Sequence, residues 1–286
     1  MRKTLLAAVI FSAASVVSAG GLGSQAAPWL RIPTDTRSAA MGGATSALSE
    51  GTGALAVNPA GLALADQSTL FISHSFWAED LLLEHGAYAQ KTGGLGFAFG
   101  ADYLNFGSVE QFNIGLGGTP IPDGTATPQA LALSAGGGME VTKGFYVGAA
   151  LKWAGESLQG SWGSSFSGSL GLLYRHESGF SAGAALLNAG QALDGFSLPL
   201  ETSLGAAFTR SLGEGSQKND HVATLSGQWD YFPDSASSTF GLGGEYWYHQ
   251  VFAARAGYRF ESYGNSEGLK GFTLGAGLKL TQFELS

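Results

Sequence analysis

From residue 67 to its end, the chain is a succession of segments of about ten residues in which apolar side chains alternate with polar or small ones. Short clusters of turn residues separate these segments. Successive side chains of a β-strand point to opposite faces, so each segment has one apolar face and one more polar face. The segments 223–231 and 252–261 show the alternation most clearly. Such repetition is the sequence pattern of a transmembrane β-barrel.

A soluble β-sandwich also alternates, so further features are needed to choose between the two folds. Aromatic residues lie at both ends of several apolar faces, as with Phe145 and Trp153 or Phe252 and Phe260. Lipid-facing strands place aromatic girdles at both membrane interfaces. About a dozen strands also exceed what one sandwich domain holds. We therefore expect an all-β fold, a transmembrane antiparallel β-barrel of about 12–14 strands with an N-terminal plug segment.

The alternation predicts strand cores at 68–76, 81–90, 94–105, 130–141, 144–156, 164–176, 179–188, 200–211, 221–232, 238–248, 251–262 and 270–283. The segment 106–128 contains Gly-Gly-Thr-Pro and Pro-Asp-Gly and is predicted to be a long extracellular loop without strands. Tight connections at 142–143, 177–178 and 249–250 alternate with longer ones, as in outer-membrane barrels with short periplasmic turns. The long connection after 200–211 breaks this rule.

The composition limits the classes of protein to which the chain can belong. Glycine supplies 45 of 286 residues and charged residues only 13%, as in some disordered chains. Many glycines, however, alternate with large apolar residues, an order that a disordered chain lacks. The absence of cysteine excludes disulfides and thiolate metal sites. The net charge of −8 argues against nucleic acid as a partner.

The N-terminus reads as an export signal. Arg2 and Lys3 precede an apolar run over 5–17, and Val-Ser-Ala at 17–19 is a small-residue cleavage site. A membrane-spanning helix is the alternative, but it needs about 20 apolar residues. We expect a signal peptide over 1–19, an N-terminal arm and plug over 20–66, and a transmembrane barrel over 67–286.

The stretch 38–63 does not alternate and is rich in residues small enough for close packing against other backbone. Asn58 is a suitable N-cap and Pro59 suits the first helical position, so a very short helix is predicted to start there. Either a small-residue linker or a plug inside the barrel explains this stretch, and the strands that follow favour a plug. The residues assigned to the plug motif are Met41, Gly42, Gly43, Asn58, Pro59, Ala60 and Gly61.

Two motifs in this stretch resemble the N-terminal signature of the PorV/PorQ family: Arg-Ser-Ala-Ala-Met-Gly-Gly-Ala at 37–44 and Asn-Pro-Ala-Gly-Leu-Ala at 58–63. Weaker similarity continues at 187–188, 198–199, 205–208, 244–247 and 255–260. The resemblance implies an outer-membrane barrel similar in fold to the fatty-acid transporter FadL. Relatives continue beyond the segment that matches 272–285, so we expect either a truncated sequence or a barrel with fewer strands.

Charged residues on the predicted interior face are the main candidates for a site. Arg255 and Arg259 share that face with Glu245, and Lys152, Arg175 and Asp230 also fall on it. One interpretation is an ion-pair network that holds the plug. The other is a polar site for the carboxylate of an amphipathic ligand, with Arg255 or Arg259 as bidentate partner.

The five histidines have no ligand spacing, and Ser, His and acidic residues cannot be grouped into a catalytic site from the sequence. We therefore expect no metal, no cofactor and no enzymatic activity. The resemblance implies either passage of small hydrophobic or amphipathic molecules across the bacterial outer membrane or a type IX secretion component that binds exported cargo. The expected partners are outer-membrane lipid and either such a small molecule or secretion-system proteins.

Overall fold

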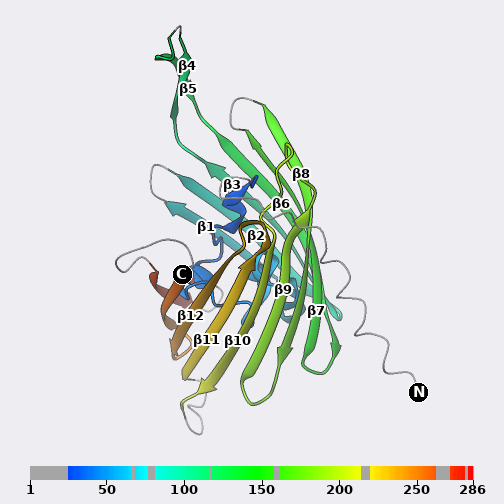
Figure 1. The fold of residues 1–286 in the computed structure, drawn as a ribbon. Helices are drawn as coiled ribbons and strands as arrows, with labels where there is room; N and C mark the ends of the chain where they lie inside the picture. The colour runs from blue at the N-terminus through cyan, green and yellow to red at the C-terminus, as the bar shows by residue number, and fades with distance from the viewer. Residues whose placement is uncertain are drawn as a thin grey trace, which may run out of the picture.

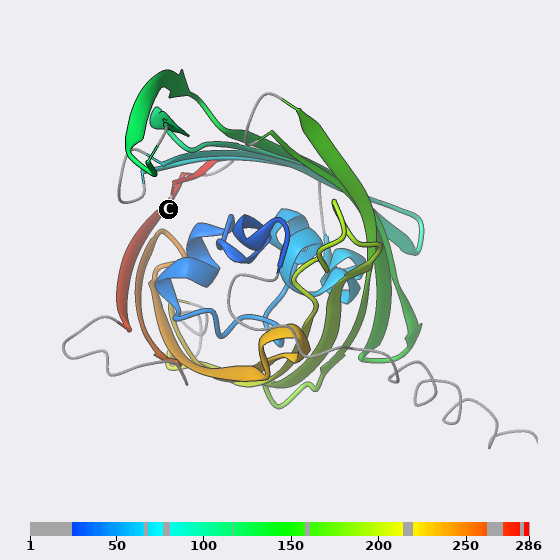
Figure 2. The same ribbon diagram turned by 45° about the horizontal axis from the view of Figure 1, so that its top comes forward.

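A computed structural model describes residues 25–65, 68–76, 81–115, 117–157, 161–213, 220–261, 271–280 and 283–285. The predicted signal peptide lies outside these residues. An antiparallel sheet of thirteen strands curls around an N-terminal segment (Figures 1 and 2). Its strands follow one another in chain order apart from β4 and β5, which form a separate two-stranded sheet. The predicted all-β barrel is thus confirmed.

The twelve predicted strand cores all correspond to strands of the large sheet, and their ends agree to within about three residues. The strands are β1 (Thr69–Phe76), β2 (Leu82–Thr92), β3 (Leu95–Asn105), β6 (Gln129–Thr142), β7 (Phe145–Ser157), β8 (Trp162–Arg175), β9 (Phe180–Gly190), β10 (Glu201–Ser211), β11 (His221–Phe232), β12 (Ser237–Tyr248), β13 (Phe252–Glu261) and β14 (Phe272–Leu280). The short β15 (Phe283–Leu285) continues the ladder beyond β14.

The prediction of a strandless loop over 106–128 is wrong. This segment contains the hairpin of β4 (Val109–Ile114) and β5 (Pro120–Ala126), which projects beyond the rest of the sheet (Figure 1). Pro120 and Pro122 lie within β5, and proline is tolerated there because β5 is the edge of a two-stranded sheet. Gly-Gly-Thr at 117–119 lies in or beside the turn between the two strands, whereas Pro-Asp-Gly at 122–124 lies inside β5, so these residues did not mark the strand ends.

The two faces of the large sheet differ as the alternation predicts. On β11, the Leu225 and Trp229 side chains are exposed on the outer face, whereas Ser226, Gln228 and Asp230 are buried on the inner one. On β13, Phe252 and Phe260 are exposed and Arg255 is buried. The outer face is thus a continuous apolar surface, and the polar side chains point into the lumen.

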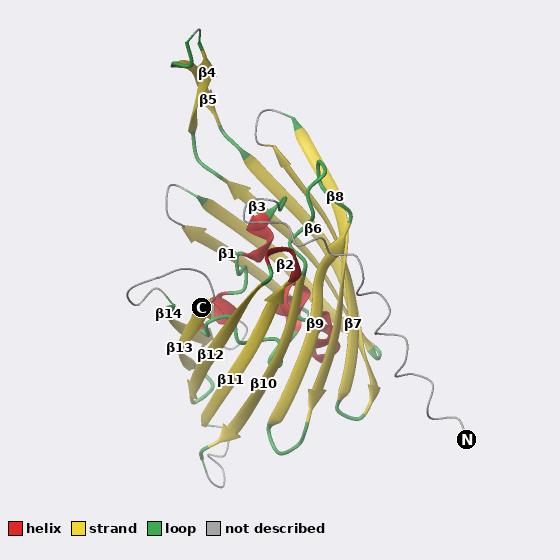
Figure 3. Ribbon diagram, viewed as in Figure 1, coloured by secondary structure: helices red, strands yellow, loops and turns green. Residues whose placement is uncertain are grey.

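The N-terminal segment forms short helical turns inside the ring of strands (Figures 2 and 3). They are η1 (Pro28–Arg31), α1 (Thr36–Ala40), η2 (Gly51–Gly53), α2 (Ala54–Val57) and η3 (Pro59–Leu64). We call residues 25–65 the plug. No helix among the described residues has the length and apolar character that a membrane crossing would need.

Close approach between plug and wall depends on glycines of the strands. A Cβ atom at Gly96 of β3 would overlap the Leu62 carbonyl of the plug, and one at Gly148 of β7 would overlap the Pro59 carbonyl. Only glycine lets the two backbones meet at this distance. At these two positions, glycine therefore allows the plug to pack closely against the lumen wall.

Candidate functional site

Asn58 connects the helical turns of the plug to the barrel wall. Its side-chain oxygen accepts from the Ala60 amide at 3.2 Å and so caps η3, as predicted. Its side-chain nitrogen donates to the carbonyl of Ser46 and to that of Leu172 on β8, each at 3.0 Å. Asn58 is completely buried, and three hydrogen bonds satisfy its amide. It therefore fixes the turn of the plug and its position against the wall.

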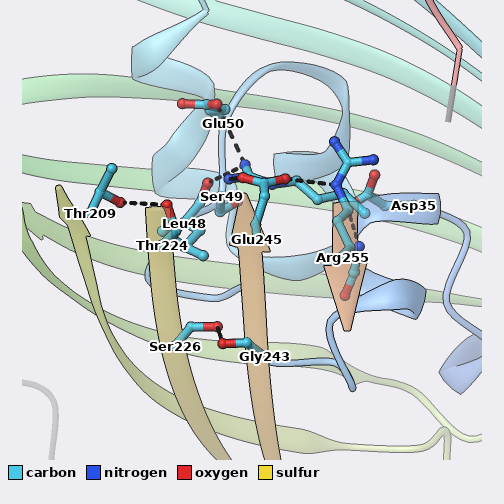
Figure 4. Close-up of polar contacts among 12 residues, drawn as sticks. Asp35, Leu48, Ser49, Glu50, Thr209, Thr224, Ser226, Gly243, Glu245 and Arg255 are labelled. Carbon is cyan, nitrogen blue, oxygen red and sulfur yellow. Dashed lines mark hydrogen bonds and ion pairs between the residues drawn. The ribbon is translucent and has the colours of Figure 1, made fainter. Parts of the chain in front are cut away.

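A buried ion-pair group joins α1 to two neighbouring strands (Figure 4). Arg37 donates to both carboxylate oxygens of Glu245 on β12, at 3.0 and 2.7 Å. Arg255, the ladder partner of Glu245 on β13, donates to the same carboxylate at 2.6 Å. The side chains of Glu245 and Arg255 are 1% and 2% exposed, so both depend on this pairing. We call these three residues the latch.

Glu50 extends the latch toward the short-turn end of the barrel. Its carboxylate lies 3.5 Å from Arg37 and 3.1 Å from Arg175 of β8. Burial acts to lower the pKa of the Arg37 guanidinium, but the carboxylates of Glu245 and Glu50 outweigh this effect and raise that pKa above its ordinary value. Arg37 therefore stays charged, and its ion pair with Glu245 attaches the plug to the wall.

A cavity lies on each side of the plug. The one near the short turns has a volume of about 290 Å³ and is lined by the latch residues Arg37 and Glu245 together with Arg175, His176 and Trp247. The other, of about 90 Å³, lies toward the ends of β3, β7 and β11 and the start of β10, where the longer connections are. We call it the upper cavity. Residues of the plug line both cavities.

The upper cavity has both apolar and charged walls. Apolar side chains come from the plug and the strands, among them Trp29, Leu30, Ile32, Leu83 and Leu187. Charged side chains come mainly from the strands, namely Asp102, Lys152, Glu201, Asp230 and Arg259, with Arg31 and Asp35 from the plug. A space of this kind suits a small molecule with an apolar body and a polar end.

Asp230 is the best-satisfied charge of this cavity. It accepts from Ser203 and from Gln228, each at 2.7 Å, and from Thr239 at 3.3 Å. The Arg259 guanidinium lies 3.6 Å from its carboxylate. Gln228 in turn accepts from the Ser46 amide of the plug at 2.8 Å. This network continues from the wall into the plug backbone.

His85 and Asp102 form a second polar pair in the upper wall, with 2.5 Å between His85 Nδ1 and Asp102 Oδ1. Ser73 is the ladder partner of His85 on the other side, so serine, histidine and aspartate lie in one row across β1, β2 and β3. The Ser73 hydroxyl, however, donates to the Thr34 carbonyl of the plug at 3.1 Å. This row thus attaches β1 to the plug.

The structure divides the predicted charged residues into two groups. Arg255 and Glu245 belong to the latch, whereas Arg259 lines the upper cavity beside Asp230. Among the predicted plug residues, Gly42 donates its amide to Thr273 of β14 at 3.1 Å, and Met41 is fully buried. The described residues contain no group of His, Cys, Asp and Glu that could hold a metal ion.

Two side chains of the cavity were not singled out as site residues from the sequence. Lys152 donates to the Asn188 side-chain oxygen at 3.1 Å, and Glu201 accepts from the Ser203 hydroxyl at 2.9 Å. Lys152 was placed on the interior face, but Glu201 starts its strand and its neighbours do not alternate clearly. Only the ladder between β9 and β10 brings it beside Asn188.

These features define a class of protein: an antiparallel barrel with a lumen closed by an N-terminal plug. The Pseudomonas putida toluene transporter TodX has a similar structure, with a TM-score of 0.61 over 92% of this chain and 90% of TodX at 16% identity. The Ralstonia pickettii toluene transporter TbuX gives a TM-score of 0.55 over 84% and 87% at 15% identity. No family model and no curated protein matches the sequence. The chain therefore shares the barrel fold of these two proteins.

Proposed function

We propose that this protein is a bacterial outer-membrane channel through which small hydrophobic or amphipathic molecules pass, and that the plug gates it. The observation that carries the proposal is the plug itself, bound between two cavities by Asn58 and by the latch. The exposed apolar outer face supports a membrane location. Two toluene transporters of the same fold support hydrophobic molecules as the substrate class.

Membership of the PorV/PorQ family is the finer part of this proposal, and the motifs at 37–44 and 58–63 support it. The division into a signal peptide over 1–19, an N-terminal arm and plug over 20–66 and a transmembrane barrel over 67–286 is also part of this proposal. The alternative role in type IX secretion needs a surface that receives a protein. The solved structures of the same fold support passage of small molecules instead.

A reversible lock of the plug tests the proposal. Ser46 of the plug faces Gly205 of β10, and the chain has no native cysteine, so Ser46→Cys with Gly205→Cys places two thiols side by side. Intact cells that produce this variant are tested for uptake of labelled toluene. We expect uptake to fall to the level of cells without the protein after oxidation and to recover after reduction.

Two single-cysteine variants are the matched controls, because each carries one thiol and cannot form the lock. Their uptake is expected to be the same under oxidising and reducing conditions. Equal uptake by the oxidised and reduced double variant, once the disulfide is shown to form, would contradict a plug that gates passage.

A further inference from the structure

Two opposite charges face the upper cavity without forming an ion pair with each other. Among the described residues, Lys152 Nζ has one hydrogen-bond partner, the Asn188 side-chain oxygen at 3.1 Å. The Glu201 carboxylate likewise has one hydrogen-bond partner, the Ser203 hydroxyl at 2.9 Å. Both residues line the same cavity. An ammonium group has three donors and a carboxylate about four acceptor positions, so most of the hydrogen-bonding capacity of both groups is unused.

The Ser203 hydroxyl does not fully satisfy Glu201. It has a single hydrogen, and its oxygen also lies 2.7 Å from the Asp230 carboxylate. Donation to Asp230 leaves the Glu201 oxygen without that hydrogen. Asp230 and Asp102 are supplied with other donors, Gln228 and His85 respectively. Among these three carboxylates, Glu201 therefore has the fewest hydrogen-bond donors, and a donor on a bound molecule stabilises it most.

The backbone of Asn188, the partner of Lys152, is irregular next to the strand that carries Glu201. Asn188 lies in β9 with a φ of 57°, a left-handed conformation that few residues other than glycine adopt in a strand. Its side-chain nitrogen donates to the Pro199 carbonyl at 3.3 Å, which leaves its oxygen for Lys152. The neighbouring Leu187 is the ladder partner of Glu201. Irregular backbone beside a cavity commonly redirects a side chain for binding.

We propose that the upper cavity selects neutral amphipathic molecules whose polar end both donates and accepts hydrogen bonds, that is, a small aromatic alcohol or phenol. This inference rests on the proposed function and names its substrate class. A hydroxyl group donates to Glu201 and accepts from Lys152, while Trp29, Leu83 and Leu187 contact the apolar body. A pure hydrocarbon forms a hydrogen bond with neither side chain, and a carboxylate has no hydrogen to donate to Glu201.

Three probes of nearly equal size test this inference: benzyl alcohol, toluene and benzoate. Their binding to the full chain in lipid nanodiscs is measured by equilibrium dialysis, and partition into empty nanodiscs is subtracted. We expect benzyl alcohol to bind most tightly. Lys152→Met and Glu201→Met should each weaken its binding about tenfold, the factor that one hydrogen bond to a charged group supplies. Toluene binding should change little.

The double variant Lys152→Met with Glu201→Met leaves the formal net charge of the cavity unchanged, because it removes one base and one acid, and it removes both polar partners. We expect it to fold, to lose the preference for benzyl alcohol and to bind toluene more tightly than the parent. Lys143→Met and Glu177→Gln, which alter an exposed pair in the short turns, are controls expected to bind all three probes as the parent does.

Three results would overturn the inference. Tightest binding of benzoate would assign a carboxylate site, and tightest binding of toluene, unaffected by the variants, would assign an apolar pocket. Failure of all three probes to bind would also overturn it. Toluene uptake that responds to the plug lock would still support passage through the barrel in each case, so the inference and the proposed function fail separately.

Discussion

Arg37 of the plug donates to both carboxylate oxygens of Glu245 on β12, at 3.0 and 2.7 Å. Arg255 donates to the same carboxylate, so one acidic side chain pairs with two arginines. This arrangement makes Glu245 the residue on which the attachment of the plug depends most strongly. The first two predictions concern this attachment and that of Asn58.

Glu245→Gln should destabilise the barrel by about 3–5 kcal/mol, because the buried Arg255 guanidinium loses the carboxylate of Glu245 and the half-buried Arg37 keeps only the more distant Glu50. The free energy of unfolding is measured in a denaturant titration. Loss of heat-modifiable mobility on gels reports the unfolded fraction. Glu177→Gln is the matched control, since Glu177 pairs with Lys143 at the surface, where both side chains are largely exposed and such pairs contribute little. Equal stability of the two variants would argue against the latch.

Asn58→Ala should cost more than the loss of a helix cap, which alone is worth about 1 kcal/mol. The substitution also leaves the Ser46 and Leu172 carbonyls without their donor, and an unsatisfied buried group costs about 1–3 kcal/mol. We therefore expect a loss of about 3 kcal/mol or more, the sum of about 1 kcal/mol for the cap and about 1 kcal/mol for each of the two carbonyls. Asn113→Ala in the exposed hairpin should be neutral. A loss of stability of only about 1 kcal/mol, the value of the cap alone, would mean that Asn58 does not hold the plug to β8.

Gly148→Ala should displace the plug, since the new methyl group would overlap the Pro59 carbonyl. Overpacking of this kind costs about 1–3 kcal/mol. Gly86→Ala is the control, because nothing lies within 4 Å of a Cβ at that position. Protection of the plug amides from hydrogen exchange should fall in the first variant only. Unchanged protection in both variants would show that plug and wall tolerate a wider separation.

The strands were predictable from the sequence because a barrel strand has a lipid face and a lumen face, which the alternation of Leu225, Ser226 and Gly227 records directly. The β4–β5 hairpin was missed for the same reason. Its residues on both faces are exposed, so no alternation marks it, and Pro120 and Pro122 gave turn signals inside a strand.

The candidate site was less predictable. The alternation placed Arg255, Arg259 and Glu245 in the lumen, but it could not tell which of them contacts the plug. That distinction depends on Arg37, which lies about 200 residues earlier in the chain and in a segment without periodicity. Glu201 was missed because its relation to Lys152 arises from ladder register and from the left-handed backbone of Asn188.

Leu225→Arg tests the membrane face. The Leu225 side chain is 72% exposed in the middle of β11, so at the bilayer midplane an arginine there should cost about 2–4 kcal/mol. Leu212→Arg, just beyond the end of β10, should cost no more than about 1 kcal/mol, because charges near the interface are tolerated. The free energy of unfolding from lipid vesicles is measured for both variants. Equal costs would contradict a lipid-facing β11.

The conductance of a plug deletion tests the central claim most directly. Removal of residues 38–62 takes away Asn58 and most of the plug but leaves every strand in place. The account predicts that this variant inserts into planar bilayers and forms open pores, whereas the parent chain conducts little under the same conditions. A variant that inserts with its heat-modifiable mobility intact but conducts no more than the parent would contradict the claim that the plug closes the lumen.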